Sequence, residues 1–241
     1  MTTEQSQKGT LYLVPNTLGK TPENNTIPDY VLNIIRQLDV LIVENVQTAS
    51  RYLQWVGDTI PEYEIDFFVL NKKTPIQEII SFIKPLKQGK DAGLISEAGC
   101  PVVADPGSEL IKLAHDNDIT VSPLVGPSSI LLALMGSGFN GQQFSFHGYL
   151  PIDKNKRQSA ITQLEKESQK TGSTQIFMEA PHRNDAVKKD VIRLCQPQTR
   201  FCTATNLTLP DELIISKKIS EWRKDAGLSI HKEPTIFLIY A

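Results

Sequence analysis

The chain has 241 residues, of which 40% are hydrophobic and 22% charged, so it can bury one sizeable core or two modest ones. This composition excludes disordered, collagen-like and coiled-coil proteins. The 25 Lys+Arg and 27 Asp+Glu give a formal net charge of −2, without the basic excess of a dedicated nucleic-acid binder. However, residues 1–150 hold 10 basic and 16 acidic side chains, whereas residues 151–241 hold 15 and 11. A basic second half hints at a polyanionic partner.

No targeting or membrane segment is expected. The N-terminal MTTEQSQKGT lacks the basic and apolar regions of a signal peptide, and the three cysteines show neither a CxxC pair nor a disulfide framework. The uncharged stretch 119–152 contains an apolar run only from Ile130 to Met135, far short of the ~20 residues that span a bilayer. We therefore expect a cytoplasmic protein. The four histidines have no spacing typical of a metal site, and no metal is expected.

The first half alternates short apolar runs, typical of strands, with stretches of helical period. The expected strands are 11–14, 40–43, 65–70, 92–96 and 120–125, and the expected helices are 29–38, 48–56, 76–86, 108–115 and 128–135. Strands that alternate with crossover helices indicate a mainly parallel sheet covered on both faces. The Gly-rich segment 136–141 ends this pattern and marks the approach to a domain boundary.

In the second half, strands follow one another more directly. The expected strands are 144–150, 174–178, 200–205, 212–216 and 235–240, and the expected helices are 154–169, 185–194 and 221–224. This order indicates an α+β domain with an antiparallel or mixed sheet. The sequence therefore predicts two α/β domains, 1–138 and 139–241, with a cleft between them.

Two loops at expected strand ends are rich in small residues. SEAGCPVVADPGSE (96–109) leads from a strand into a helix, and ligands of parallel α/β sheets bind outside the carboxyl ends of strands. An ordinary loop with Asp105 as helix N-cap is the alternative. In PLVGPSS (123–129), Pro127 starts a helix and leaves the amides of Ser128 and Ser129 free for a carboxylate or phosphate. Together the two loops can line one crevice.

Three side chains are candidates for proton transfer. Glu179 and His182 belong to MEAPHR (178–183), which follows an expected strand of the second domain, and Glu44 follows a strand of the first. A hydrogen-bonded surface group is the plainer interpretation of Glu179 or His182 alone. The usual nucleotide and hydrolase fingerprints, GxGxxG, GxxxxGK[ST], GxSxG and HExxH, are absent, which argues against a conventional Rossmann or P-loop enzyme.

The motifs together resemble a known family. LYLVPNTLGK, SEAGCPVVADPG, PLVGPSS, FSFHGYLP, MEAPHR and TIFLIYA occur in the order and at the approximate spacing of the tetrapyrrole methylase superfamily, from about Thr10 to Ala241. The chain is most similar to the branch that methylates a ribose 2′-oxygen of small-subunit ribosomal RNA. This resemblance implies an S-adenosylmethionine (SAM) methyltransferase that is a homodimer, binds SAM between two α/β domains, and has ribosomal RNA or the small ribosomal subunit as partner.

The resemblance also implies which residues contact SAM. They are Leu18, Glu97, Ala98, Gly99, Cys100, Ser128, Ser129, Met178, Ala204 and Pro234. If the acceptor must lose a proton, Glu44, Glu179 and His182 are the candidate bases. If RNA is the acceptor, Lys154, Lys156, Arg157 and Arg183 are expected to contact phosphates.

The chain departs from the RNA branch mainly on the acceptor side. Glu44-Asn45-Val46-Gln47 replaces Glu-Asp-Thr-Arg, so the second carboxylate and the arginine are missing. Residues 67–71 replace Tyr-His-Glu-His-Asn, residues 204–209 replace Ala-Arg-Glu-Leu-Thr-Lys, and Glu97 stands where Asp is commoner. Two alternatives therefore stay open: a methylase of a small or tetrapyrrole-like acceptor, and a non-catalytic SAM-binding protein with a degenerate acceptor site.

Overall fold

The chain divides into two compact units, Met1–Pro127 and Ser128–Ala241, in a computed structural model that describes residues 8–20, 25–225 and 227–241. Helix α6 (Ser129–Ser137) therefore belongs to the second unit, and the boundary lies before it rather than after residue 138. The reason is packing: a Cβ on Gly136 would lie 2.5 Å from the Ile214 side chain, and the Ser216 hydroxyl donates to the Ser137 carbonyl at 2.8 Å.

The first unit contains a five-stranded parallel sheet in the order β3-β2-β4-β1-β5. Its strands are β1 (Thr10–Val14), β2 (Val40–Val43), β3 (Asp66–Val69), β4 (Ala92–Ile95) and β5 (Thr120–Pro123). All five expected strands are present, and the expected parallel sheet is confirmed. The carboxyl ends of the strands therefore share one edge, where ligands of such sheets bind.

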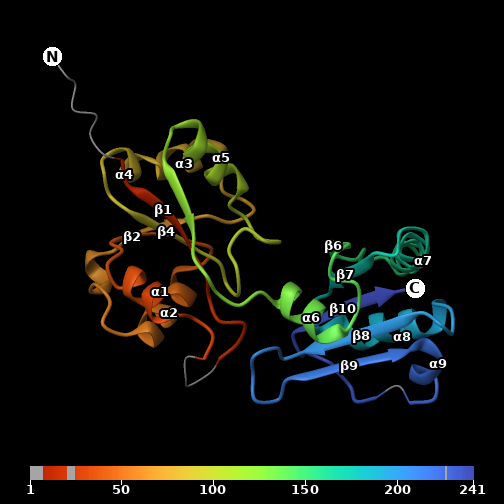
Figure 1. Cartoon of the computed structure of the whole chain (residues 1–241). Coiled ribbons are helices and arrows are strands. Elements are labelled where there is room, and N and C mark those ends of the chain that lie inside the picture. Colours follow the sequence, from red (N-terminus) through yellow and green to blue (C-terminus); the bar gives the residue numbers. More distant parts are fainter. Residues whose placement is uncertain (1–7, 21–24, 226) are drawn as a thin grey trace. The chain divides into compact units, whose positions relative to one another are not determined.

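Helices cover both faces of this sheet (Figure 1). The helices α1 (Asp29–Ile35) and α2 (Val46–Val56) lie on one face, and α3 (Ile76–Phe82), α4 (Lys84–Lys87) and α5 (Ser108–Asp116) lie on the other; a short 3-10 helix, η1, spans Glu62–Glu64. Alternate residues of β2 serve the two cores: Leu41 and Val43 pack with α1 and α2, whereas Val40 and Ile42 pack with the other helices. Burial on both faces explains why β2 is continuously apolar.

Three helices of the first unit differ from the expectation, and the first of them, α1, ends at Ile35 rather than at residue 38. The predicted helix 76–86 is two helices, α3 and α4, because Pro85 has no N–H and its ring disfavours an uninterrupted helix. Helix α2 begins at Val46 rather than Thr48, because the Asn45 side chain accepts a hydrogen bond from the Thr48 amide at 3.2 Å and caps the helix.

The second unit contains a mixed sheet in the order β6-β7-β10-β8-β9. Its strands are β6 (Phe144–Tyr149), β7 (Thr174–Met178), β8 (Arg200–Thr205), β9 (Leu213–Lys218) and β10 (Thr235–Tyr240). Strand β6 runs parallel to β7, and the other neighbours are antiparallel. The carboxyl ends of β7 and β8 therefore lie beside the start of β10.

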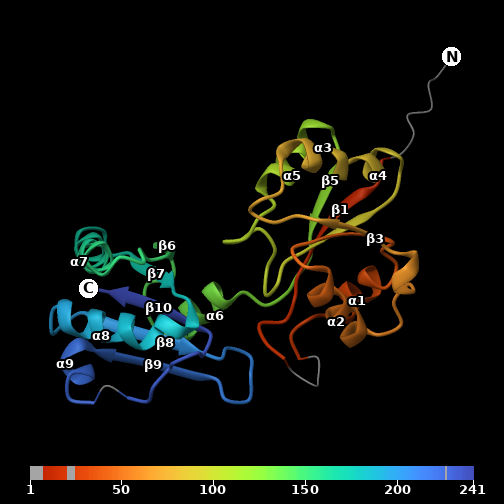
Figure 2. The same cartoon turned by 180° about the vertical axis from the view of Figure 1, so that it is seen from behind.

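One face of this sheet supports the core of the unit, and α6 covers the other (Figures 1 and 2). The core face carries α7 (Lys154–Thr171), α8 (Asn184–Leu194) and α9 (Ile219–Trp222), and a 3-10 helix, η2, spans Pro181–Arg183. Phe237 lies between Phe177 and Phe201, with ring centroids 5.3 and 6.1 Å away. Within the described residues, no helix is both long and apolar enough to cross a membrane.

Candidate functional site

The loops after β1 and β4 are joined at the carboxyl edge of the first sheet. The Asn16 amide donates to the Gly99 carbonyl at 2.9 Å, and the Gly99 amide donates to the Asn16 carbonyl at 3.1 Å. The buried Asn16 side chain also donates to the carbonyls of Ser96 and Glu97, both at 3.1 Å. This network fixes the loop that carries most of the predicted SAM contacts of the first unit.

Within that loop, Gly99 has a backbone that favours glycine. Its φ is +67°, and a Cβ there would lie 3.1 Å from the Leu18 Cδ2 and 3.4 Å from the Pro127 carbonyl oxygen. The Cys100 thiol donates to the same carbonyl at 3.5 Å, and burial raises its pKa. Gly99 is buried, whereas Glu97 and Ala98 are exposed. Glu97 and Ala98 therefore offer side chains to a ligand, whereas Gly99 offers its backbone.

Three carboxylates, Glu44, Glu97 and Asp105, form a carboxylate cluster at this edge. Burial raises the pKa of Glu44, the charges of Asp105 and Glu97 raise it further, and Lys72 and a hydrogen bond from the Glu97 backbone oppose the rise. The Glu44 Oε1 is buried and has no hydrogen-bond partner among the described residues. Glu44 therefore combines a raised pKa with an oxygen free to accept a proton.

Asp105 belongs to this carboxylate cluster and does not cap a helix. Burial raises the pKa of Asp105, against a hydrogen bond from the Ser96 side chain and the charge of Lys72. The N-cap of α5 is Gly107, so the interpretation of Asp105 as the N-cap is wrong. Asp105 and Lys72 line a cavity of about 390 Å³ together with Asn71, Thr74 and the start of α5.

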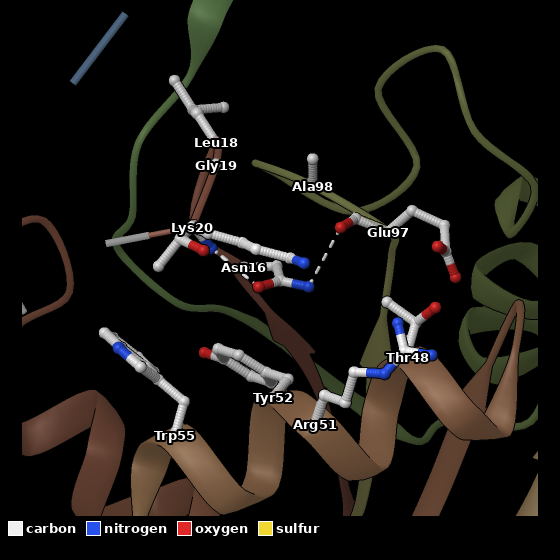
Figure 3. A pocket seen from close by; sticks show the side chains of 11 residues that line it. Asn16, Leu18, Gly19, Lys20, Thr48, Arg51, Tyr52, Trp55, Glu97 and Ala98 are labelled. Atoms are coloured by element: carbon white, nitrogen blue, oxygen red, sulfur yellow. Dashed lines mark hydrogen bonds between the residues drawn. The ribbon is translucent and has the colours of Figure 1, made fainter. Parts of the chain in front are cut away.

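A second cavity, called the α2 pocket below, has a volume of about 270 Å³. It is lined by Asn16, Thr17, Leu18, Gly19, Lys20, Thr48, Arg51, Tyr52, Trp55, Glu97 and Ala98. Thr48, Arg51, Tyr52 and Trp55 follow the i, i+3, i+4, i+7 spacing of one helix face, and Figure 3 shows them on the side of α2 that faces the β1 loop. The pocket thus joins predicted SAM contacts to a helix face that the sequence did not single out.

The aromatic floor of the α2 pocket is held in place. The Tyr52 hydroxyl donates to the Pro15 carbonyl at 2.7 Å, and Tyr52 is buried. Its ring stacks on Trp55 with centroids 5.8 Å apart and planes at 17°. Trp55 is only partly buried and lines the pocket. The sequence signal for this face was the helical spacing of residues 48–56. The same spacing is equally typical of a helix that packs against the core.

Among the predicted site residues of the second unit, Met178, Ala204 and Pro234 gather at one end of its sheet. Met178 and Ala204 both pair with Ile236, and the Pro234 carbonyl accepts the Asn206 amide at 2.9 Å. Ala204 is buried, whereas Pro234 is exposed. In the same unit, Ser128 caps α6 by accepting the Leu131 amide at 3.5 Å, and Ser129 is the first helical residue.

Two of the candidate charged residues of the second unit, Glu179 and Arg157, form buried ion pairs within the protein. Glu179 is buried and forms an ion pair with Arg183 at 2.8 Å, and Arg183 also donates to the Pro151 carbonyl at 3.2 Å. His182 lies exposed in η2. Arg157 is buried in an ion pair with Asp190 at 2.8 Å, so the expectation that it contacts phosphates is wrong. Lys154 and Lys156 are exposed, as expected.

Comparison with solved structures gives the class of protein. Over 96% of this chain and 94% of the other, the fold matches the methyltransferase CobJ at a TM-score of 0.58 and 15% identity. A uroporphyrin-III C-methyltransferase from Thermus thermophilus, complexed with S-adenosyl homocysteine, matches at 0.55 and 13% identity over 96% of this chain and 97% of that one. The fold is that of tetrapyrrole methyltransferases.

Sequence comparison then gives the family. The family Tetrapyrrole (Corrin/Porphyrin) Methylases matches residues 26–222, and this chain belongs to it and is a methyltransferase. Two relatives, both named ribosomal RNA small subunit methyltransferase I, are 31% identical over 90% of this chain. The chain spans 66% of the relative from Micromonospora olivasterospora and 74% of that from Buchnera aphidicola subsp. Acyrthosiphon pisum (strain APS).

Proposed function

We propose that this protein transfers a methyl group from SAM to a ribose 2′-hydroxyl of small-subunit ribosomal RNA, in the cytoplasm and as a homodimer. The observation that carries the proposal is the state of Glu44, a carboxylate with a raised pKa and a buried oxygen without a partner at the ligand-binding edge of the sheet. The names of the relatives support ribosomal RNA as the acceptor.

The residues after β4 suit SAM. Gly99 brings backbone close to Leu18 without a Cβ, and the exposed Ala98 leaves room beside it. SAM supplies an electrophilic methyl group on a positively charged sulfur. The carboxylate cluster places negative charge at the same edge, which favours a cation there. We propose Leu18, Glu97, Ala98, Gly99 and Cys100 as the contacts of the first unit, and Ser128, Ser129, Met178, Ala204 and Pro234 as those of the second.

Glu44 is the residue we propose as the general base. Bound SAM would give its methyl group to the ribose oxygen and leave as S-adenosyl homocysteine, and the Glu44 carboxylate would take the proton of that hydroxyl. The raised pKa of Glu44 makes it a stronger base than an exposed glutamate while it is ionised. Glu179 and His182 remain proposed catalytic residues of the second unit, but the buried pair with Arg183 already occupies Glu179.

A small or tetrapyrrole-like acceptor is the second candidate. The observation that favours it is the change at the start of α2, where Asn45 serves as a helix cap and Gln47 is exposed, in place of the acidic and basic residues of the RNA branch. Arg51, one turn after Gln47, returns a cation to that region of α2.

A methyl-transfer assay with labelled SAM separates these functions. The acceptors are small-subunit ribosomal RNA transcribed in vitro, small subunits stripped of modification, and a free tetrapyrrole. We expect label in the RNA or the subunits, and calorimetry should show SAM binding that Ala98→Phe weakens. Label in the tetrapyrrole alone supports the second candidate, and SAM binding without any transfer shows a non-catalytic protein.

A further inference from the structure

The α2 pocket carries two cations whose charge is not neutralised within the described part of the chain. Arg51 and Lys20 are both exposed and line the pocket, and neither side chain has a hydrogen bond or ion pair to another described residue. Figure 3 shows the Lys20 side chain extended across the opening above Tyr52. Two such cations at one cavity suit phosphate groups.

Trp55 adds a flat surface to the same cavity. It stacks on Tyr52, which packing and the hydrogen bond to Pro15 hold fixed, so the pair forms a rigid platform. Single-stranded RNA is commonly bound by bases stacked on aromatic side chains beside a basic surface. A volume of about 270 Å³ lies just below the range for drug-sized ligands, which suits one base rather than a macrocycle.

The α2 pocket shares Leu18, Glu97 and Ala98 with the proposed SAM site, and its α2 side differs from that site in charge. SAM carries a positive sulfur, an ammonium group and a single carboxylate but no phosphate, so the carboxylate cluster attracts its sulfur, whereas two neighbouring cations favour phosphate groups. The cations come from α2 and the β1 loop; of the carboxylate cluster, Glu97 lines the α2 pocket, whereas Glu44 and Asp105 do not. The cations and Trp55 therefore lie on the α2 and β1-loop sides of the pocket, and Glu97 and Ala98 form the side next to the proposed SAM site.

We propose that the α2 pocket binds one nucleotide of the RNA next to the methylated ribose, with its base stacked on Trp55 and its phosphates held by Arg51 and Lys20. This inference rests on the proposed function, because it assigns the acceptor's neighbouring nucleotide to that site. This RNA contact uses none of the proposed catalytic residues, Glu44, Glu179 and His182.

Tryptophan fluorescence tests the stacking directly. The chain has two tryptophans, and Trp222 is 1% exposed, so a quencher at the surface acts mainly on Trp55. Titration of the wild type with an unmodified RNA oligonucleotide should quench the emission, and Trp55→Phe should abolish the quenching. No quenching in the wild type, or equal quenching in Trp55→Phe, overturns the inference.

Affinity measurements complete the test. Trp55→Ala should weaken RNA binding by about 5-fold to about 100-fold, the range for loss of one stacked base. Arg51→Gln and Lys20→Gln should each lower the slope of log affinity against log salt by about 0.7. The matched control is Lys87→Gln on α4, which removes an exposed cation from the opposite face of the sheet.

The outcomes separate this inference from the proposed function. Variants that bind and methylate RNA like the wild type overturn the inference and leave the function standing. A wild type that binds RNA through Trp55 but methylates none of it supports the inference and overturns the function. Loss of SAM affinity in Trp55→Ala assigns the pocket to the donor and overturns the inference.

Discussion

The surroundings of Glu44 raise the pKa of its carboxyl group. It follows a fully buried strand, so its carboxylate is partly desolvated, and Asp105 and Glu97 add like charge. Each influence favours the protonated form and raises the pKa of Glu44. Because a base must be ionised, the pH at which transfer begins reports this environment.

Asp105→Asn should therefore shift the acidic limb of the pH profile. Removal of the like charge lowers the pKa of Glu44, so the ionised base persists to lower pH and the limb moves to lower pH. The measurement is the rate of methyl transfer against pH. Asp116→Asn, at the exposed end of α5, is the control, and an unshifted limb in Asp105→Asn would show that the limb does not belong to Glu44.

Gly99→Ala should destabilise the first unit by about 1–2 kcal/mol. A left-handed φ of +67° disfavours an L side chain, and the new Cβ would lie 3.1 Å from Leu18. Gly141→Ala is the matched control, since nothing lies within 4 Å of its Cβ position. Denaturant unfolding measures both variants. Equal free energies of unfolding would contradict the strain at Gly99.

At the scale of elements, a buried ion pair holds α7 to α8. Asp190 accepts from the Arg157 Nη2 at 2.8 Å and Nε at 3.1 Å, and from Arg193 and Gln158 at 3.1 Å each. Burial raises the pKa of Asp190, but these hydrogen bonds outweigh it and leave the pKa below its ordinary value. The contribution of Asp190 to stability is therefore present above about pH 3.9 and is lost as the pH falls through the lowered pKa.

Arg157→Ala should cost about 3 kcal/mol of unfolding free energy, because it removes both hydrogen bonds to the buried Asp190 Oδ2, while Arg193 and Gln158 still hold Oδ1. Lys156→Ala, the exposed neighbour, should change the free energy by less than about 0.5 kcal/mol. Thermal and denaturant unfolding near neutral pH provide the comparison. A similar small effect in both variants would mean that Arg157 is not structural.

Local pattern predicted most elements, and contacts distant in sequence decided the rest. Alternation and apolar runs were enough for the strands, and small residues at a strand end were enough to locate the loop that contains Glu97 to Cys100. The burial of Arg157 depends on Asp190, 33 positions away, so local pattern did not show that this cation is paired within the protein. Arg51 and Trp55 were missed because helical spacing shows which residues share a face but not what that face meets.

The oligomeric state of the molecule depends on contacts between chains, so it is a prediction at the largest scale. The homodimer proposed above rests on family resemblance. The two chains of a homodimer are usually related by a twofold axis. Light scattering at micromolar concentration should therefore give twice the chain mass of 26.9 kDa. A mass of 26.9 kDa would show a monomer and contradict the dimer.

The most direct test is a single-turnover transfer of labelled methyl from SAM to unmodified small-subunit ribosomal RNA by the wild type and by Glu44→Gln. Glutamine keeps the shape of the side chain but cannot accept the proton. We predict transfer by the wild type and a rate lower by about 100-fold to 10,000-fold in Glu44→Gln, with the affinities for SAM and RNA retained. No transfer by the wild type, or equal rates for the two proteins, would contradict this account.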